Sequence, residues 1–302
     1  MKKLIALVLA LMAAAVLLTS CGKAPAPGSD GPSRPSGEET VQQNRVITAE
    51  EGKARMESGD PVVIVDVRTP QEYEEKHIPG AILIPVETIG DRQPELLPVL
   101  DAEILIYCRS GNRSADAAAK LAALGYTNLS DFGGIRDWPY ETEDGDWDTA
   151  EGTFESFRAV DLYGVPYDDE LFDDHSVTMV NVWATFCGYC LDEMPDIQRV
   201  SDDFAGRGFQ AVGIVADTLD SRGEGDMDQI RLARGQAAET GVKYPQLILS
   251  YDLANALGNV QAVPVTFFVD GDGELLSDPI TGARSYNEWK TIVEDLLAKA
   301  GA

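Results

Sequence analysis

The chain has 302 residues, a length that favours two domains, and its composition is that of a globular protein. Its formal net charge is -27, from 51 acidic and 24 basic side chains. Such an acidic surface repels nucleic acid and anionic lipid, so we exclude both as direct partners of the folded part.

The N-terminus has the pattern of an export signal. Lys2 and Lys3 precede an apolar run over residues 4–18, which is too short to span a membrane and fits a signal peptide. The run ends in Leu-Thr-Ser-Cys, which resembles a bacterial lipobox over residues 1–21. This resemblance implies that Cys21 is lipidated and anchors an extracytoplasmic protein to the bacterial cell membrane. An ordinary secretory signal with a chance cysteine is the alternative.

Residues 22–45 are rich in Gly, Pro and Ser, and we expect them to form a flexible linker. Export places the following domains in a compartment where disulfides persist. The number of cysteines therefore indicates which of them can pair. With Cys21 assigned to the anchor, Cys108, Cys187 and Cys190 remain, and an odd number cannot all pair within one chain.

Strand and helix patterns alternate over residues 46–148, which predicts a parallel α/β domain. Capping boxes begin at Thr48 and Thr69 and predict two helices, while apolar runs at residues 62–67 and 104–108 predict buried strands. An alanine-rich helix is expected over residues 114–124. Because chemistry in such sheets lies at the carboxyl ends of the strands, Cys108 is placed at a functional edge.

The residues from Cys108 to Arg113 lie between a predicted strand and the helix that follows it. Their backbone N–H groups and the helix dipole can form a cradle for an anion, and two arginines add positive charge. The cradle consists of Arg109, Ser110, Gly111, Asn112 and Arg113. Such a loop lowers the pKa of a thiol, and the thiolate can hold sulfur as a persulfide. From the loop alone, a small buried core cysteine remains an equal alternative.

Three motifs in this domain occur in the order DVRTPQEYEEKHIPGAILIP, YCRSGNRS and FGGIRDWPY. Together they resemble a single-domain rhodanese. The resemblance implies that Cys108 is the sulfur-carrying nucleophile and that a sulfane-sulfur donor is a partner. It also implies that Asp66 and Arg68 belong to a structural motif near the site, and we expect His77 to be a hydrogen-bonding scaffold residue.

In the second domain, residues 152–300, a predicted strand at residues 177–183 runs toward a Cys-x-x-Cys motif and a helix. Cys187 and Cys190 therefore lie about one helical turn apart and can form a disulfide. We expect Cys187 to be exposed and to attack, and Cys190 to resolve the mixed disulfide. A structural zinc site would need four ligands, and a purely structural disulfide of this length would add little stability.

Further strands are expected at residues 209–217 and 244–250 and on both sides of the Gly-Asp-Gly turn at residues 271–273. One helix should end at Gly241, and Pro195 should kink another. The last helix carries an apolar stripe at Trp289, Ile292, Val293, Leu296 and Leu297.

This order of elements, with the motif NVWATFCGYCLDEMP, resembles a thioredoxin-like domain of the membrane-tethered TlpA/ResA type, typified by the cytochrome c-maturation reductases. The resemblance implies that Glu193 is an active-site acid, with a solvated helix position as the alternative. It also implies a cis peptide bond between Val263 and Pro264, where a client chain can pair. Phe186 departs from the pattern, since a tryptophan usually precedes the first cysteine.

We therefore predict an α/β protein of two domains, rhodanese-like and then thioredoxin-like. The predicted function is that of a membrane-anchored thiol-disulfide oxidoreductase fused to a sulfurtransferase; the resemblance favours a reductant, and an oxidative folding enzyme is an alternative. The expected partners are protein thiols and disulfides, a sulfane-sulfur donor and a membrane thiol electron donor, with no metal or cofactor. The alternative is a catalytically inert first domain that docks or senses a partner.

Overall fold

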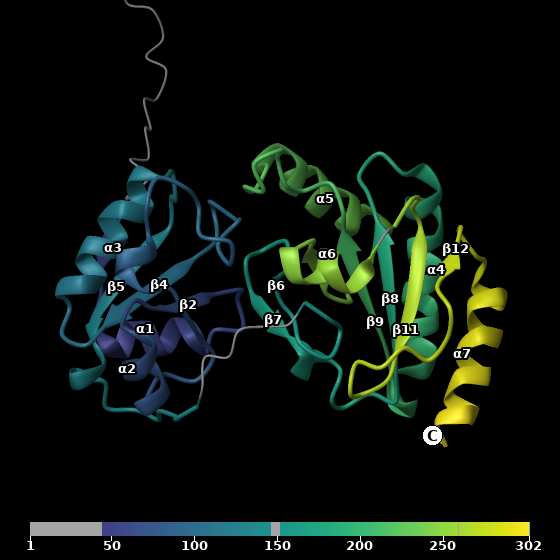
Figure 1. Cartoon of the computed structure of the whole chain (residues 1–302), viewed down its shortest axis with the longest axis horizontal. Helices are drawn as coiled ribbons and strands as arrows, with labels where there is room; N and C mark the ends of the chain where they lie inside the picture. The colour runs from purple at the N-terminus through teal and green to yellow at the C-terminus, as the bar shows by residue number, and fades with distance from the viewer. Residues whose placement is uncertain (1–43, 146–151, 259, 302) are drawn as a thin grey trace, which may run out of the picture. The chain divides into compact units, whose positions relative to one another are not determined.

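The computed structural model describes residues 44–145, 152–258 and 260–301, which form two α/β domains (Figure 1). The predicted export segment, Cys21 and most of the predicted linker, up to residue 43, lie outside the described residues. Within the described ranges, no helix combines the length and the apolar character needed to cross a membrane.

The first domain is built on a five-stranded sheet with the order β1-β5-β4-β2-β3, in which every pairing is parallel. The elements are β1 (Asn44–Val46), α1 (Ala49–Met56), β2 (Val63–Asp66), α2 (Pro70–Glu75), β3 (Ala81–Leu83), β4 (Ile104–Cys108), α3 (Asn112–Ala123) and β5 (Leu129–Gly134). The domain begins at Asn44, inside the expected linker, because β1 pairs with β5 and completes the sheet edge.

Local sequence signals account for most helix starts in this domain. Thr48 and Thr69 both make the expected capping boxes, with Glu51 and Glu72, and Pro70 occupies the first turn of α2. Helix α3 begins at Asn112 rather than at residue 114, because Gly111 adopts a left-handed conformation, φ 97°, and turns the chain directly into the helix. The connecting loop is therefore shorter than expected.

Helices cover both faces of this sheet, as the apolar strands predict. Buried residues of β2 and β4 such as Val65 and Ile106 pack with Ala117 and Leu121 of α3. On the opposite face Tyr107 packs in a cluster with partly buried residues of α1 and with Tyr73 of α2. Cys108 belongs to the α3 face and ends the middle strand of the sheet.

The second domain contains a five-stranded mixed sheet with the order β10-β9-β8-β11-β12. Its elements are β8 (Val177–Trp183), α4 (Gly188–Phe204), β9 (Phe209–Val215), α5 (Met227–Thr240), β10 (Gln246–Ile248), α6 (Tyr251–Leu257), β11 (Val265–Val269), β12 (Ile280–Thr281) and α7 (Tyr286–Ala300), preceded by a hairpin of β6 (Arg158–Val160) and β7 (Pro166–Asp168). Strands β8, β9 and β10 are parallel, and β11 runs antiparallel to β8.

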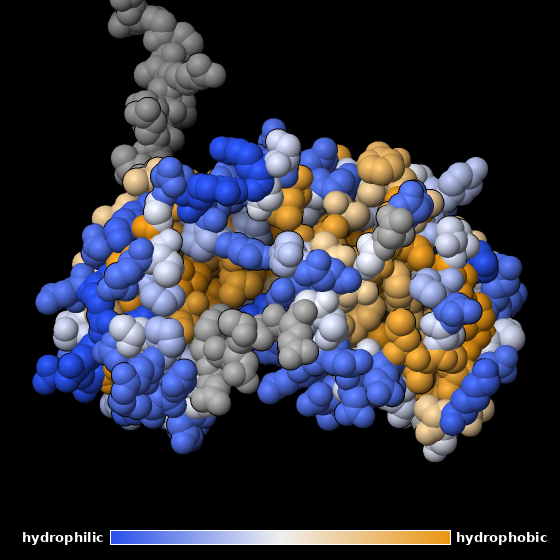
Figure 2. Space-filling model, in the orientation of Figure 1, coloured by the Kyte–Doolittle hydropathy of each residue, from blue (hydrophilic) through white to orange (hydrophobic). Residues whose placement is uncertain are grey.

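The two faces of this sheet carry separate apolar clusters. Helices α4 and α7 pack on one face, where Trp289, Val293, Leu296 and Leu297 are buried as the stripe predicts and Ile292 is partly buried. Helix α6 and the hairpin pack on the other face with Val180 and Val182 of β8. Figure 2 shows hydrophilic residues over much of the visible face, with hydrophobic residues gathered where β11 lies in Figure 1.

One strand expected after the Gly-Asp-Gly turn does not form. Leu275 makes only an isolated bridge to Val269 and is 55% exposed. The Asp270 carboxylate accepts hydrogen bonds from the backbone N–H groups of Asp272 and Glu274, so these groups do not enter a sheet ladder. The edge strand is instead β12, five residues farther along the chain.

Candidate active sites

Cys108 is the last residue of β4, at the carboxyl edge of the first sheet. Its thiol is free and the residue is only 1% exposed. The backbone N–H of Gly111 points back at the sulfur, with a nitrogen–sulfur distance of 3.1 Å. The predicted cradle is therefore built mainly from backbone groups that follow the cysteine.

The polar surroundings of the sulfur favour its charged form. Burial raises the pKa of the Cys108 thiol, but hydrogen bonds from the N–H groups of Ser110, Ser114 and Gly111 and from the Ser114 hydroxyl together hold this pKa below its usual value. A thiolate that accepts hydrogen bonds from such a loop is a nucleophile. A core cysteine without these hydrogen-bond donors would be inert.

The cradle depends on a close backbone contact with β5. A Cβ atom on Gly134 would lie 2.5 Å from the Arg109 carbonyl oxygen and 2.6 Å from the Ser110 Cα, so only glycine fits there. Gly134 is also the ladder partner of Cys108, beyond an irregularity in the β4–β5 register. Gly134 belongs to the motif FGGIRDWPY, but nothing in the sequence indicates its role at the site.

The two arginines of the loop lie in different surroundings. The Arg113 guanidinium binds both oxygens of the Glu72 carboxylate, at 2.6 and 2.8 Å. These hydrogen bonds lower the pKa of the Glu72 carboxyl to about 2. The Arg109 side chain is exposed, and no carboxylate of the described part of the chain pairs with it. Arg113, expected to bind an anion, is thus already engaged by a carboxylate.

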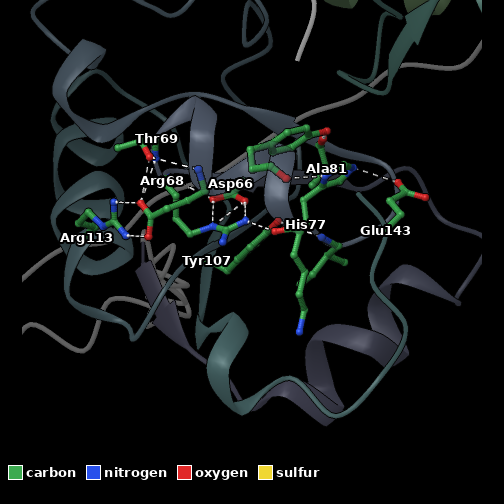
Figure 3. A network of polar contacts seen from close by, with 12 residues as sticks. Asp66, Arg68, Thr69, His77, Ala81, Tyr107, Arg113 and Glu143 are labelled. Carbon is green, nitrogen blue, oxygen red and sulfur yellow. Dashed lines mark hydrogen bonds and ion pairs between the residues drawn. The ribbon is translucent and has the colours of Figure 1, made fainter. Parts of the chain in front are cut away.

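A polar network forms around Asp66 and Arg68, whose guanidinium lies over the ring of Tyr107 in β4 (Figure 3). Arg68 donates to both oxygens of Asp66, at distances down to 2.6 Å, and also to the Lys76 carbonyl. The His77 ring stacks on Tyr73 with 3.7 Å between ring centroids, and its Nε2 lies 3.2 Å from a Glu143 oxygen. His77 lies in this network as the scaffold residue that the sequence predicts.

The second candidate site is the disulfide between Cys187 and Cys190, at the start of α4. Cys187 is the N-cap of the helix, and its sulfur lies 3.2 Å from the backbone nitrogen of Cys190. The expectation of an exposed Cys187 is wrong, since only 9% of the residue is accessible and its sulfur lies 3.7 Å from the Val263 carbonyl oxygen.

Apolar groups surround this disulfide. Phe186 is 79% exposed and Tyr189 is 76% exposed, so the residues next to the cysteines form an apolar rim. The peptide bond between Val263 and Pro264 is cis, as predicted. A groove of about 550 Å³ begins beside it and is lined by Phe186, Val263 and apolar residues of α6 and the loop that follows.

Glu193 is buried rather than solvated, with 3% of the residue exposed. Its carboxylate accepts hydrogen bonds from Asn181 Nδ2 at 3.1 Å, the Arg284 N–H at 3.0 Å and Trp289 Nε1 at 3.3 Å. Burial raises the pKa of the Glu193 carboxyl despite these three donors. Glu193 lies three residues after Cys190 in α4, so both occupy the same helix face.

One further residue, which the sequence does not indicate, positions the disulfide. The Asp217 carboxylate, just after β9, accepts hydrogen bonds from the Thr185 N–H at 3.0 Å and the Thr185 hydroxyl at 2.6 Å. These bonds fix the turn that leads from β8 into Cys187. An aspartate at a strand end carries no signal of this contact, because Thr185 lies 32 residues away, in the turn that follows a different strand.

Comparison with known proteins identifies both domains. The rhodanese-like domain model matches residues 48–140, and the AhpC/TSA family model matches residues 153–277. The thiosulfate sulfurtransferase PspE of Escherichia coli is 34% identical over 73 residues, which make up 24% of this chain and 70% of that protein. A sulfurtransferase of Allochromatium vinosum is 38% identical over 93 residues, or 30% of this chain and 85% of that protein.

Among solved structures, a thiol:disulfide interchange protein of Chlorobium tepidum is 27% identical, covers 47% of this chain and 92% of its own, and has a TM-score of 0.40. The predicted fold class, a rhodanese-like domain before a thioredoxin-like domain, is confirmed. The predicted enzyme class, a sulfurtransferase-type domain fused to one of oxidoreductase type, is confirmed at the level of these families.

The contact at Gly134 makes a direct prediction. The substitution Gly134→Ala pushes the loop away from β5, withdraws N–H groups from the Cys108 sulfur and raises the pKa of its thiol. We expect alkylation of the Cys108 peptide, followed by mass spectrometry, to require a higher pH than in the wild type. Gly90→Ala is the matched control, since a Cβ there meets no atom within 4 Å. An unchanged pH profile in Gly134→Ala would contradict this role.

Proposed function

The chain belongs to the rhodanese-like family through residues 48–140, and on this basis we propose that its first domain is a sulfurtransferase that carries sulfur on Cys108. The observation that carries the proposal is the set of N–H groups directed at the Cys108 sulfur, which lowers the pKa of the thiol. The thiolate attacks the outer sulfur of a donor and forms a new S–S bond. The donor's own S–S bond breaks, and the rest of the donor leaves with that electron pair.

The test is the mass of the Cys108 peptide after exposure to a sulfane-sulfur donor and removal of excess reagent. We expect a gain of one sulfur atom in the wild type and no gain in Cys108→Ser. A thiol acceptor should then remove the added sulfur. An unmodified Cys108 under all donors would instead support a first domain that only docks or senses a partner.

The second domain, in this proposal, reduces disulfides of client proteins. Cys187 attacks a client disulfide, the client S–S bond breaks, and one client cysteine leaves as a thiolate. Cys190 then attacks the Cys187 sulfur, which releases the second client thiol and re-forms the internal disulfide. A membrane thiol donor must supply two electrons to restore the dithiol. The apolar groove beside the cis peptide suits an apolar client segment.

Glu193 is proposed to accept the Cys190 proton in the resolving step. Because burial raises the pKa of this carboxyl, the rate of client reduction should rise with pH through that raised pKa as the carboxylate forms. We expect Cys187→Ser to abolish reduction of a protein disulfide and Glu193→Gln to slow it by about 100-fold and remove this rise. The exposed neighbour Asp192→Asn is the control. Equal pH profiles for Glu193→Gln and wild type would argue against the proton transfer.

We also propose that lipidated Cys21 anchors the chain on the outer side of the bacterial cell membrane. The support is the lipobox-like sequence and the composition of residues 22–45, which are rich in Gly, Pro and Ser as a flexible linker would be. In cells we expect the wild type in the membrane fraction and the Cys21→Ser chain in the soluble fraction. Recovery of both chains in the same fraction would overturn the anchor.

A further inference from the structure

We propose that Glu72 makes the Cys108 site selective for organic persulfides, R–S–SH, over the dianion thiosulfate. The inference rests on the proposed sulfurtransferase function and names the class of donor for that same site. Its basis is the ion pair between Glu72 and Arg113, which removes one of the two cationic groups that the loop sequence offers to an anionic donor.

The Arg113–Glu72 pair is a specific contact. Both carboxylate oxygens are bound, at 2.6 and 2.8 Å, which is the geometry of a bidentate Arg–carboxylate pair. Both side chains are less than one-third exposed, at 29% and 26%, so water screens the pair only partly. The same Glu72 carboxylate also accepts from the Thr69 N–H and so closes the capping box of α2. Two independent partners thus hold the negative charge in place.

This placement changes the charge that a donor meets at the loop. Cys108 and Arg113 are close enough to interact electrostatically, so the neutralised guanidinium lies within range of the reacting sulfur. Glu87 adds a second negative charge near Arg113. The positive groups that remain at the loop are the exposed Arg109, the exposed Arg136, whose backbone N–H donates to the Arg109 carbonyl, and the N–H groups already bound to the Cys108 sulfur. The negative charge of a dianion that approaches the Cys108 thiolate is therefore poorly compensated.

A persulfide carries at most one negative charge on its sulfur atoms, against two charges on thiosulfate, and it reacts through its protonated form, R–S–SH, which meets no such repulsion. The Cys108 thiolate attacks the terminal sulfur of R–S–SH, an S–S bond forms at Cys108, and the donor S–S bond breaks. The products are R–S⁻ and Cys108–S–SH, so the negative charge moves to the leaving thiolate and the proton stays on the transferred sulfur. No oxidant or metal is consumed. With thiosulfate the same attack must release sulfite, and both reactants are anions.

The experiment compares two donors, thiosulfate and cysteine persulfide, on the full chain and on Glu72→Gln. Glutamine can still accept the capping hydrogen bond, so α2 keeps its start. In the wild type we expect kcat/KM to be at least about tenfold higher for the persulfide. Glu72→Gln should raise kcat/KM for thiosulfate by about tenfold, mainly through KM, and make it more sensitive to salt. The persulfide value should change by less than about twofold.

Two controls isolate the ion pair. Glu75→Gln removes an exposed carboxylate from the same helix and should leave both donors unchanged. Combining Glu72→Gln with Arg113→Gln removes the freed cation, so the gain with thiosulfate should disappear. Faster loading from thiosulfate in the wild type, or no change in Glu72→Gln, overturns the donor selectivity alone. Failure of both donors to load Cys108 overturns the sulfurtransferase function and this inference with it.

Discussion

In both domains a backbone N–H group three residues downstream of a cysteine is directed at its sulfur. Gly111 N lies 3.1 Å from the Cys108 sulfur, and Cys190 N lies 3.2 Å from the Cys187 sulfur. Each of these cysteines lies between the carboxyl end of a strand and the first turn of a helix. Because unpaired N–H groups gather at a helix start, this position stabilises negative charge on sulfur without a metal or a buried base.

The surroundings then give the two sulfurs different chemistry. Cys108 has no cysteine partner in the described part of the chain and is enclosed by a loop that Gly134 allows to lie against β5, so the site suits the transfer of one sulfur atom. Cys187 has Cys190 one helical turn away, an apolar groove beside it and the buried carboxyl of Glu193 on the same helix face as Cys190. These features suit two-electron exchange with a protein chain.

Much of the fold follows from short-range sequence signals. The capping boxes at Thr48 and Thr69 are read from four consecutive residues, and the apolar strands from their composition, so both were predicted. The β6–β7 hairpin and α6 were not, because three-residue strands and a seven-residue helix show too little periodicity. After β11, the Asp270 side chain binds backbone N–H groups that a strand would otherwise use. The amino-acid composition of this segment does not predict that contact.

The cysteines of both sites were also predicted, because the number of cysteines, the spacing between them and the residues beside them can be read directly from the sequence. The contacts that tune them are long-range. Glu72 is 41 residues from Arg113, and Gly134 is 26 residues from Cys108, so only the sheet order brings each pair together. Two arginines beside a cysteine therefore suggested a doubly cationic loop, whereas the folded chain neutralises one of them.

The proposed chemistry at Cys108 depends most on the lowered pKa of its thiol. The direct measurement is the ultraviolet absorbance of the thiolate as pH is varied, taken as the difference between the full chain and Cys108→Ser with Cys187 and Cys190 oxidised. We predict a midpoint clearly below about 8.5, the ordinary value for a cysteine thiol. A midpoint at or above that value would contradict the account, because burial would then outweigh the N–H groups and Cys108 would be an inert core thiol.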